Sequence, residues 1–301
     1  MNGDAHMTDG SVSHGVLSGL VRSARPKQWL KNVLVFAAPG AAGVLSTGDG
    51  VWRSLVVFGV FCLAASGTYL FNDIADRESD RHHPTKRRRP IAAGVVPVRV
   101  AVVAGVVLLS ASVGVSVVLG WRTTMVTVAY VVLTLSYSAV FRQVAVLDLV
   151  AIAAGFVLRA VAGAVAVDVP MSTWFVLCVS FGALFVVVGK RYAEFLELES
   201  GQMPGRATLS VYTQPYLRAM LTMACTIAIL TYCLWAFESN TAAGSVFFEV
   251  SIVPVVAAFM RYLLVLDQGR GAAPEEVFAS DRVLQGLGVV WAVVYALAVY
   301  T

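Results

Sequence analysis

The stretch LFNDIADRESDRHHPTKRRRPIAAG, residues 70–94, gathers four acidic residues and a run of basic ones in a chain that is otherwise strongly apolar. Its acids begin directly after the apolar run LAASGTYLF. Ionisable groups are costly at the edge of a membrane span and are usually functional there. The stretch therefore indicates a membrane helix that ends at a polar site on one membrane face.

The composition of the whole chain supports a membrane protein. Hydrophobic residues make up 58% of the 301 residues and charged residues only 13%, and the mean hydropathy is +0.77. Soluble domains have roughly equal apolar and polar shares and about a quarter of charged residues. Apolar runs of about 18 residues or more can cross a hydrocarbon core as helices. We predict an all-α integral membrane protein with nine such helices, near 28–45, 51–71, 98–119, 122–141, 144–166, 171–189, 216–237, 248–266 and 282–300.

The first of these runs is the weakest, because Pro39, Gly40 and Gly43 interrupt it. Residues 1–20 are polar and rich in Gly and Ser, and we expect them to form a disordered tail without a cleavable signal. Residues 21–301 are expected to form a single polytopic membrane domain. Small-residue helix faces leave a homo-oligomer open.

The positive charges predict the orientation of the chain. If the N-terminus is cytoplasmic, only Arg53 and Arg122 of the 22 Lys and Arg residues fall on the opposite side, and Arg159 lies within a span. Cytoplasmic loops carry an excess of Lys and Arg. The charged stretch and the expected active site would then face the cytoplasm of a bacterial plasma membrane.

The acids of the opening stretch have the spacing of a cation site. Asn72, Asp76 and Asp80 are four residues apart and share one helix face, with Asp73 one step around the helix. Oxygen ligands of this kind suit Mg²⁺, which one or two carboxylates hold while it bridges substrate phosphates.

A structural alternative is that these acids only pair with Arg77 and Arg81. The basic loop that follows, Lys86 to Arg89, can anchor the topology or neutralise phosphate oxygens. A second polar cluster, GKRYAE, closes the sixth run on the same side, and Lys190 and Glu194 within it could simply form a salt bridge four residues apart. A buried Arg159 could likewise be a structural ion pair.

Several classes of function are excluded by missing motifs. The chain has no GxxxxGK[ST] loop, HExxH, CxxC or GxSxG motif, which argues against phosphate-loop NTP hydrolysis and zinc chemistry. A net charge of +4, with basic residues explained by topology and one site, gives no reason to expect a nucleic-acid partner.

NDIADRESD at 72–80 resembles the NDxxDxxxD motif of the UbiA superfamily of intramembrane prenyltransferases, and the resemblance covers nearly the whole chain. It implies a helical bundle with a polar site on the cytoplasmic side and Mg²⁺ that binds a diphosphate leaving group. The departure from the family is GKRYAE, which stands where members acting on aromatic acceptors carry a second acidic motif, DxxxD. Two cations in that place favour a donor with additional phosphate.

This variation, together with RPKQWLKNVLVFAAP, HPTKRRRPIAAG, GFVLRAVAGA, VVGKRYAE and FASDRVLQ, resembles the decaprenyl-phosphate phosphoribosyltransferase branch. The resemblance implies transfer of 5-phosphoribose from phosphoribosyl diphosphate to a polyprenyl phosphate in a membrane, for the synthesis of cell-wall arabinan.

The roles that follow fall into three groups. Metal binding is expected from Asn72, Asp73, Asp76 and Asp80, of which the three aspartates are the catalytic candidates. Donor binding is expected from Arg87, Arg88, Arg89, Lys190, Arg191, Tyr192 and Glu194. Lipid-phosphate binding or support is expected from Lys27, Lys31, Lys86, Asp148, Arg159, Asp281 and Arg282.

Two other functions stay open at this point. One is a prenyltransferase of the same superfamily that moves a prenyl group from a prenyl diphosphate to an aromatic or other small acceptor. The other is a transporter or lipid-binding membrane protein whose charges only set its topology, although matching helix interruptions in two halves of the chain are not evident.

Overall fold

The computed structural model describes residues 9–199, 207–239 and 245–300, and every regular element within those ranges is a helix. The chain forms two compact units. The first unit comprises Met1–Val33 and Leu55–Leu135. It contains α1 (Asp9–Ala24), the start of η1 (Pro26–Phe36), most of α3 (Gly48–Ala75), α4 (Arg77–His82), η3 (Lys86–Arg88), α5 (Val98–Ser116), η4 (Val117–Leu119) and most of α6 (Trp121–Ala139).

The second unit comprises Leu34–Ser54 and Ser136–Thr301. Besides the ends of elements shared with the first unit, it contains α2 (Ala37–Ala41), η2 (Val44–Ser46), η5 (Phe141–Gln143), α7 (Leu147–Ala166), α8 (Thr173–Glu199), η6 (Ala207–Ser210), α9 (Gln214–Glu238), α10 (Ser245–Val250), α11 (Ile252–Asp267), α12 (Pro274–Ser280) and α13 (Arg282–Tyr300).

Seven helical segments in the described part of the chain are long and apolar enough to cross a membrane. They are Gly48–Ala75, Val98–Leu119, Leu147–Ala166, Thr173–Glu199, Gln214–Glu238, Val246–Asp267 and Arg282–Tyr300. These segments match seven of the nine predicted runs, so the all-helical, multi-pass membrane architecture is confirmed.

The remaining two runs differ from the prediction. Run 122–141 is a helix, α6, but its Thr, Ser and Tyr residues keep it outside the seven apolar segments. Run 28–45 is not a continuous α-helix, because it is divided into η1, α2 and η2, with Gly43 at φ +71° before η2. Pro39 has no backbone N–H for an α-helical hydrogen bond, and the positive φ of Gly43 lies outside the α-helical range. The expectation of nine spanning helices is therefore not confirmed.

Of the predicted N-terminal tail, residues 1–8 lie outside the described residues, and α1 begins at Asp9.

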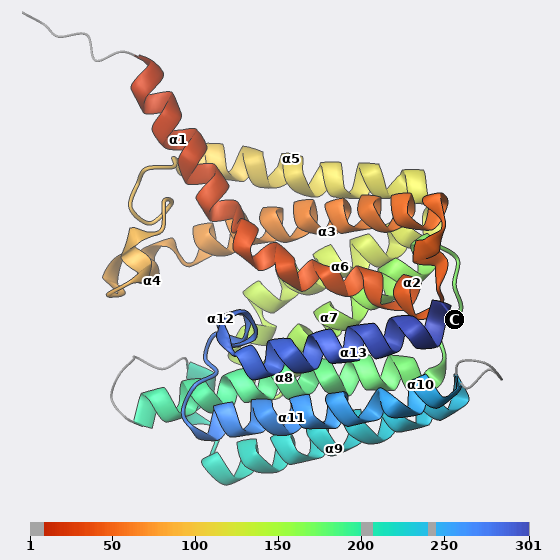
Figure 1. Ribbon diagram of the computed structural model, residues 1–301. Helices are drawn as coiled ribbons and strands as arrows, with labels where there is room; N and C mark the ends of the chain where they lie inside the picture. The colour runs from red at the N-terminus through yellow and green to blue at the C-terminus, as the bar shows by residue number, and fades with distance from the viewer. Residues whose placement is uncertain (1–8, 200–206, 240–244, 301) are drawn as a thin grey trace, which may run out of the picture. The chain divides into compact units, whose positions relative to one another are not determined.

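Close helix packing organises the first unit. In Figure 1, α3 and α5 run side by side. A Cβ added at Gly67 of α3 would overlap Leu109 of α5, and one at Gly105 of α5 would overlap Phe71 of α3. The two glycines therefore allow the helix backbones to approach closely, as small residues do in membrane bundles. A buried cluster of Leu70, Ile91, Val96 and Ala101 then packs the loop after α4 against both helices.

The second unit has its core between α7, α8, α9 and α11. Leu149, Val188, Leu217 and Leu266 are among its buried members. Figure 1 shows α8 and α9 as neighbouring helices and α11 beside α13. Glycine again permits one close contact, because a Cβ at Gly163 of α7 would overlap the carbonyl oxygen of Val35. This core supports the last turns of α8, which carry GKRYAE.

Candidate active site

Two aspartates at the end of α3 and in α4 form a buried carboxylate pair. Asp73 is 2% exposed and Asp80 is 3% exposed. The helix is interrupted only at Asp76, and the hydrogen bonds from Asp76 N–H to the Asn72 carbonyl and from Asp80 N–H to the Asp76 carbonyl preserve its period. Seven residues at about 100° each bring the side chain almost two full turns around, so Asp73 and Asp80 share a face.

Two arginines bind this carboxylate pair. Arg89 Nη1 donates to Asp73 Oδ1 at 3.1 Å and to Asp80 Oδ2 at 2.7 Å. Arg25, which lies between α1 and η1, donates from Nη2 to Asp73 Oδ1 at 2.5 Å. Burial of carboxylates is costly unless they are paired and hydrogen-bonded. The arginines therefore compensate both carboxylates and hold them close together.

The pair could hold Mg²⁺ if a substrate supplied further ligands. A single nitrogen of Arg89 contacts an oxygen of each aspartate, so those two oxygens lie close to each other. In the described part of the chain, no three His, Cys, Asp or Glu side chains gather closely enough to hold a metal ion by themselves. Mg²⁺ usually takes one or two carboxylates, waters and substrate phosphates. The carboxylate pair fits that pattern, and the half-buried Asn72 and Asp76 flank it.

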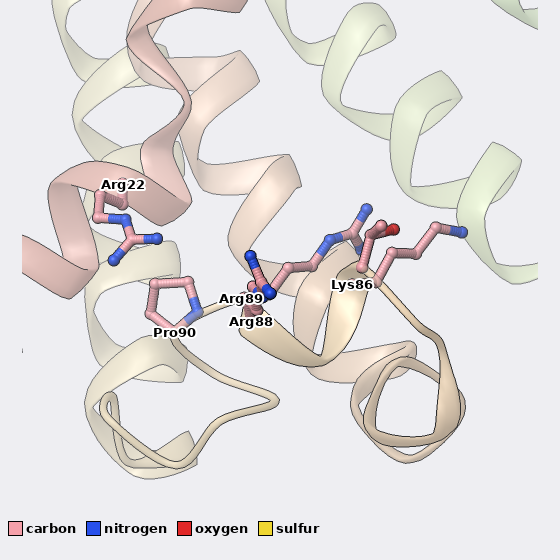
Figure 2. Close-up of a pocket in the computed structure, with 6 residues that line it drawn as sticks. Arg22, Lys86, Arg88, Arg89 and Pro90 are labelled. Carbon is pink, nitrogen blue, oxygen red and sulfur yellow. The ribbon is translucent and has the colours of Figure 1, made fainter.

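A cationic depression adjoins the carboxylate pair within the first unit. It has a volume of about 320 Å³ and is lined by Arg22, Thr85, Lys86, Arg88, Arg89 and Pro90. Figure 2 shows that Arg22 reaches it from α1, whereas the other labelled residues come from the segment after α4. Arg89 therefore belongs both to the depression and to the carboxylate pair. Arg87, by contrast, is exposed and does not line it.

His83 shapes the loop below this depression. Its Nδ1 accepts hydrogen bonds from the backbone N–H groups of Thr85 and Lys86, each at 3.3 Å. Burial lowers the pKa of His83, and the nearby Lys86 ammonium lowers it further. A neutral imidazole can accept these bonds, so the loop is held in place at neutral pH.

The second polar cluster lies in the second unit, around Arg191 of α8. Arg191 is 1% exposed, and it donates to Glu194 Oε2 at 2.5 Å and lies 3.4 Å from Asp148 Oδ2. Two carboxylates therefore compensate this guanidinium inside the protein. Lys190, one residue earlier, keeps a third of its side chain exposed and lies 4.0 Å from Glu194, so Lys190 is the more accessible cation of GKRYAE.

Tyr212 completes this cluster from the segment between η6 and α9. Its hydroxyl donates to Asp148 Oδ1 at 2.6 Å and accepts the backbone N–H of Val146 at 2.7 Å. Val146 has φ +70°, a conformation that β-branched residues rarely adopt. Burial and the hydrogen bond to Asp148 raise the pKa of Tyr212, which keeps its hydroxyl protonated as a donor. No local motif marks Tyr212, and the sequence analysis missed it.

The remaining candidates from the sequence make other contacts. Tyr192 is buried, and its hydroxyl accepts a hydrogen bond from Arg218 Nε at 3.0 Å. Arg159 is buried in α7 and donates to the Gly155 carbonyl at 2.8 Å. Asp281 pairs with Arg261, whose Nη2 lies 2.8 Å from Oδ2, while Arg282 is exposed.

Lys27 is exposed and Lys31 half-buried on η1. The sequence analysis also gave no site role to Arg22, because an arginine in the last turn of a terminal helix resembles a topology signal.

Apolar spanning helices with a buried carboxylate and arginine cluster at the end of one of them fit an intramembrane transferase. Residues 33–297 match the model of the UbiA prenyltransferase family, and the chain belongs to this family.

Three curated relatives that share one name are similar to this chain over most of its length. The chain is 43% identical to a decaprenyl-phosphate phosphoribosyltransferase of Corynebacterium glutamicum, over 94% of this chain and 87% of the relative. It is 42% identical to the protein of the same name in Mycobacterium tuberculosis, over 94% of this chain and 95% of the relative. The chain is 40% identical to the Mycolicibacterium smegmatis protein of that name, over 100% of this chain and 98% of the relative.

Solved structures support the fold. A UbiA homologue from Archaeoglobus fulgidus, solved bound to DMAPP and Mg²⁺, matches with a TM-score of 0.72 at 15% identity, over 93% of this chain and 97% of the homologue. A UbiA homologue from Aeropyrum pernix K1 matches with a TM-score of 0.62, over 87% of this chain and 96% of the homologue.

Proposed function

We propose that this protein transfers 5-phosphoribose from phosphoribosyl diphosphate to a polyprenyl phosphate and releases diphosphate. The identity of 40–43% to three decaprenyl-phosphate phosphoribosyltransferases, over nearly the whole chain, supports this assignment. The main structural support for the proposal is that the two polar clusters differ in charge. The first is a carboxylate pair, whereas the second exposes Lys190 where an acidic motif is expected for aromatic acceptors.

The carboxylate pair would serve the leaving group. Asp73 and Asp80, with Asn72 and Asp76 beside them, would hold Mg²⁺, which when bound neutralises charge on the departing diphosphate. Arg25 and Arg89 already contact Asp73. They would keep the carboxylates oriented and add positive charge where the diphosphate develops its own negative charge.

The transfer itself needs few protein groups. The bond between the anomeric carbon and the diphosphate oxygen breaks, and an oxygen of the lipid phosphate forms the new bond to that carbon. A phosphate monoester is largely ionised at neutral pH, so the nucleophile requires no strong general base. Diphosphate leaves with the electron pair of the broken bond.

In the second cluster, Lys190 would bind phosphate of the donor. Arg191 is buried between Asp148 and Glu194, and we assign it to positioning the last turns of α8 rather than to direct contact. Glu194, whose side chain is 14% exposed, would be available to ribose hydroxyls, whereas the hydroxyl of Tyr192 is already bonded to Arg218.

The excess of Lys and Arg on one side favours a cytoplasmic N-terminus in a bacterial plasma membrane. The product would then form on the cytoplasmic face as a precursor of cell-wall arabinan. Reporter fusions at residue 20 and within residues 47–50 would test this orientation. A cytoplasmic signal at 47–50 would contradict it.

The decisive experiment for the reaction incubates purified protein with Mg²⁺, phosphoribosyl diphosphate and decaprenyl phosphate. Diphosphate release and the mass of the lipid product are followed together. We expect equal amounts of both. Turnover with a prenyl diphosphate and an aromatic acid, with phosphoribosyl diphosphate inert, would overturn the assignment in favour of a prenyltransferase.

A further inference from the structure

The depression between α1 and the loop after α4 has an unusual charge balance. Four of its six lining residues are cations, and none is an acid. Arg89 forms ion pairs with Asp73 and Asp80, which neutralise its charge. Within residues 9–199, 207–239 and 245–300, neither Arg22 nor Arg88 has an ion-pair partner. The depression therefore retains positive charge that an anion can neutralise.

Packing and hydrogen bonds hold α1 and the loop after α4 together. α1 lies against the loop so closely that a Cβ at Gly19 would overlap Val96 and crowd Pro90. Pro90 in turn accepts the N–H of Val96 through its carbonyl at 3.1 Å, and Arg88 N–H donates to the Thr85 carbonyl at 3.2 Å. The backbone segments that carry Arg22 and Arg88 are therefore held beside each other, and both side chains are exposed.

Apolar side chains are exposed on the elements that carry the cations. Leu17 and Val21, one turn apart on α1, are 63% and 54% exposed, and Val95 of the loop is 49% exposed. Val103 and Val107 are also exposed along the adjoining α5, which is one of the membrane-spanning candidates. Exposed apolar side chains next to concentrated positive charge fit a phosphate that is attached to a hydrocarbon chain.

We propose that this depression binds the phosphate monoester of the polyprenyl phosphate acceptor, with Arg22 and Arg88 as its principal ligands and Lys86 beside them. The inference rests on the proposed function and assigns its acceptor site. Arg89 contacts the carboxylate pair and lines the depression, so the acceptor phosphate lies one side chain away from the carboxylates. Lys27, a candidate from the sequence, does not line the depression.

The test measures binding and turnover separately in Arg22→Ala and Arg88→Ala. Farnesyl phosphate is titrated into purified protein in neutral detergent by calorimetry, without the donor. KM is then determined for decaprenyl phosphate and for phosphoribosyl diphosphate. Loss of one charge-assisted bond to phosphate should weaken farnesyl phosphate binding and raise KM for the lipid about tenfold, while KM for the donor stays within about twofold. Arg22→Lys should restore part of the binding, because it keeps the charge.

Arg99→Ala is the matched control, because Arg99 is an exposed arginine at the start of α5 that does not line the depression. Farnesol and inorganic phosphate, titrated in the same way, separate the contributions of the chain and the phosphate. We expect both to bind more weakly than farnesyl phosphate, and only phosphate binding to depend on Arg22.

Three results would overturn the inference. The first is a rise in KM for phosphoribosyl diphosphate alone, which would assign the depression to the donor. The second is unchanged farnesyl phosphate binding together with weaker association of the variants with phosphatidic acid vesicles, which would indicate a surface contact with membrane lipid. The third is unchanged behaviour in every assay. If the unaltered protein binds farnesyl phosphate through Arg22 but makes no product, the proposed reaction fails while the phosphate site stands.

Discussion

The hydroxyl of Tyr212 donates a 2.6 Å hydrogen bond to Asp148, although 64 residues separate the two in sequence. The same hydroxyl accepts the N–H of Val146. The hydroxyl thereby connects the segment before α9 to the start of α7. The same Asp148 carboxylate also compensates Arg191.

Tyr212→Phe should lower the free energy of unfolding by about 1–3 kcal/mol, because the N–H of Val146 and the Asp148 carboxylate both lose a buried partner. Thermal unfolding of the purified protein in detergent measures the effect. Tyr216→Phe is the control, since the Tyr216 ring stacks on Tyr212 at 5.8 Å but its hydroxyl makes no hydrogen bond within the described residues. Equal losses for the two variants would contradict the role given to the Tyr212 hydroxyl.

Asp73→Asn should reduce diphosphate release by roughly 100-fold or more, because it removes a charged ligand from the carboxylate pair. The protein should remain folded, since the amide can still accept from Arg25 and Arg89. Glu78→Gln provides the control, because Glu78 is an exposed acid of α4 that pairs only with Arg81 in the described structure. A non-catalytic transporter would show no difference between the two variants in any turnover assay.

Lys190→Ala should raise KM for phosphoribosyl diphosphate about tenfold, as expected for loss of one charge-assisted contact with phosphate. The KM for the lipid should change much less. Initial rates with each substrate varied in turn provide the comparison, and Arg270→Ala, another exposed cation of the second unit, serves as the control. Equal effects on both substrates would argue against a donor role for Lys190.

Asp281 should make stability depend on acid pH. Hydrogen bonds from Arg261 and from the backbone N–H groups of Leu284 and Val283 hold the pKa of Asp281 below its ordinary value. The stabilisation is present above the unfolded-state pKa of about 3.9 and is lost as pH falls through the lower folded-state value. Melting temperatures between pH 3 and 7 should therefore converge at the acid end for the unaltered protein and Asp281→Asn. A constant difference across that range would refute the linkage.

The carboxylate site illustrates how far local periodicity reaches. The spacing of Asn72, Asp76 and Asp80 predicts one polar face at the end of a spanning helix. The structure, however, buries Asp73 with Asp80 and leaves Asp76 half-buried. Helical spacing defines which side chains share a face, but the position of Arg89 on a later loop selects the pair that becomes buried and bridged.

GKRYAE shows the same limit in another form. Two adjacent cations looked equivalent for donor binding in the sequence. The structure separates them, because Arg191 is buried between Asp148 and Glu194 while Lys190 remains accessible. The alternative of a Lys190–Glu194 salt bridge corresponds to a long ion pair, in which Lys190 Nζ lies 4.0 Å from Glu194 Oε1.

Hydropathy and residue spacing along the chain are enough to predict the membrane class, seven of the candidate spanning helices and the chemical character of the two polar clusters. Those properties are sums over neighbouring residues, so hydropathy and spacing report them directly. The folded chain was needed to show that Arg25 contacts Asp73, 48 residues away, that Tyr212 contacts Asp148, and that Arg22 lines the depression after α4. Such contacts depend on which helices and loops pack together. No local pattern of the sequence encodes which residues, distant along the chain, come into contact.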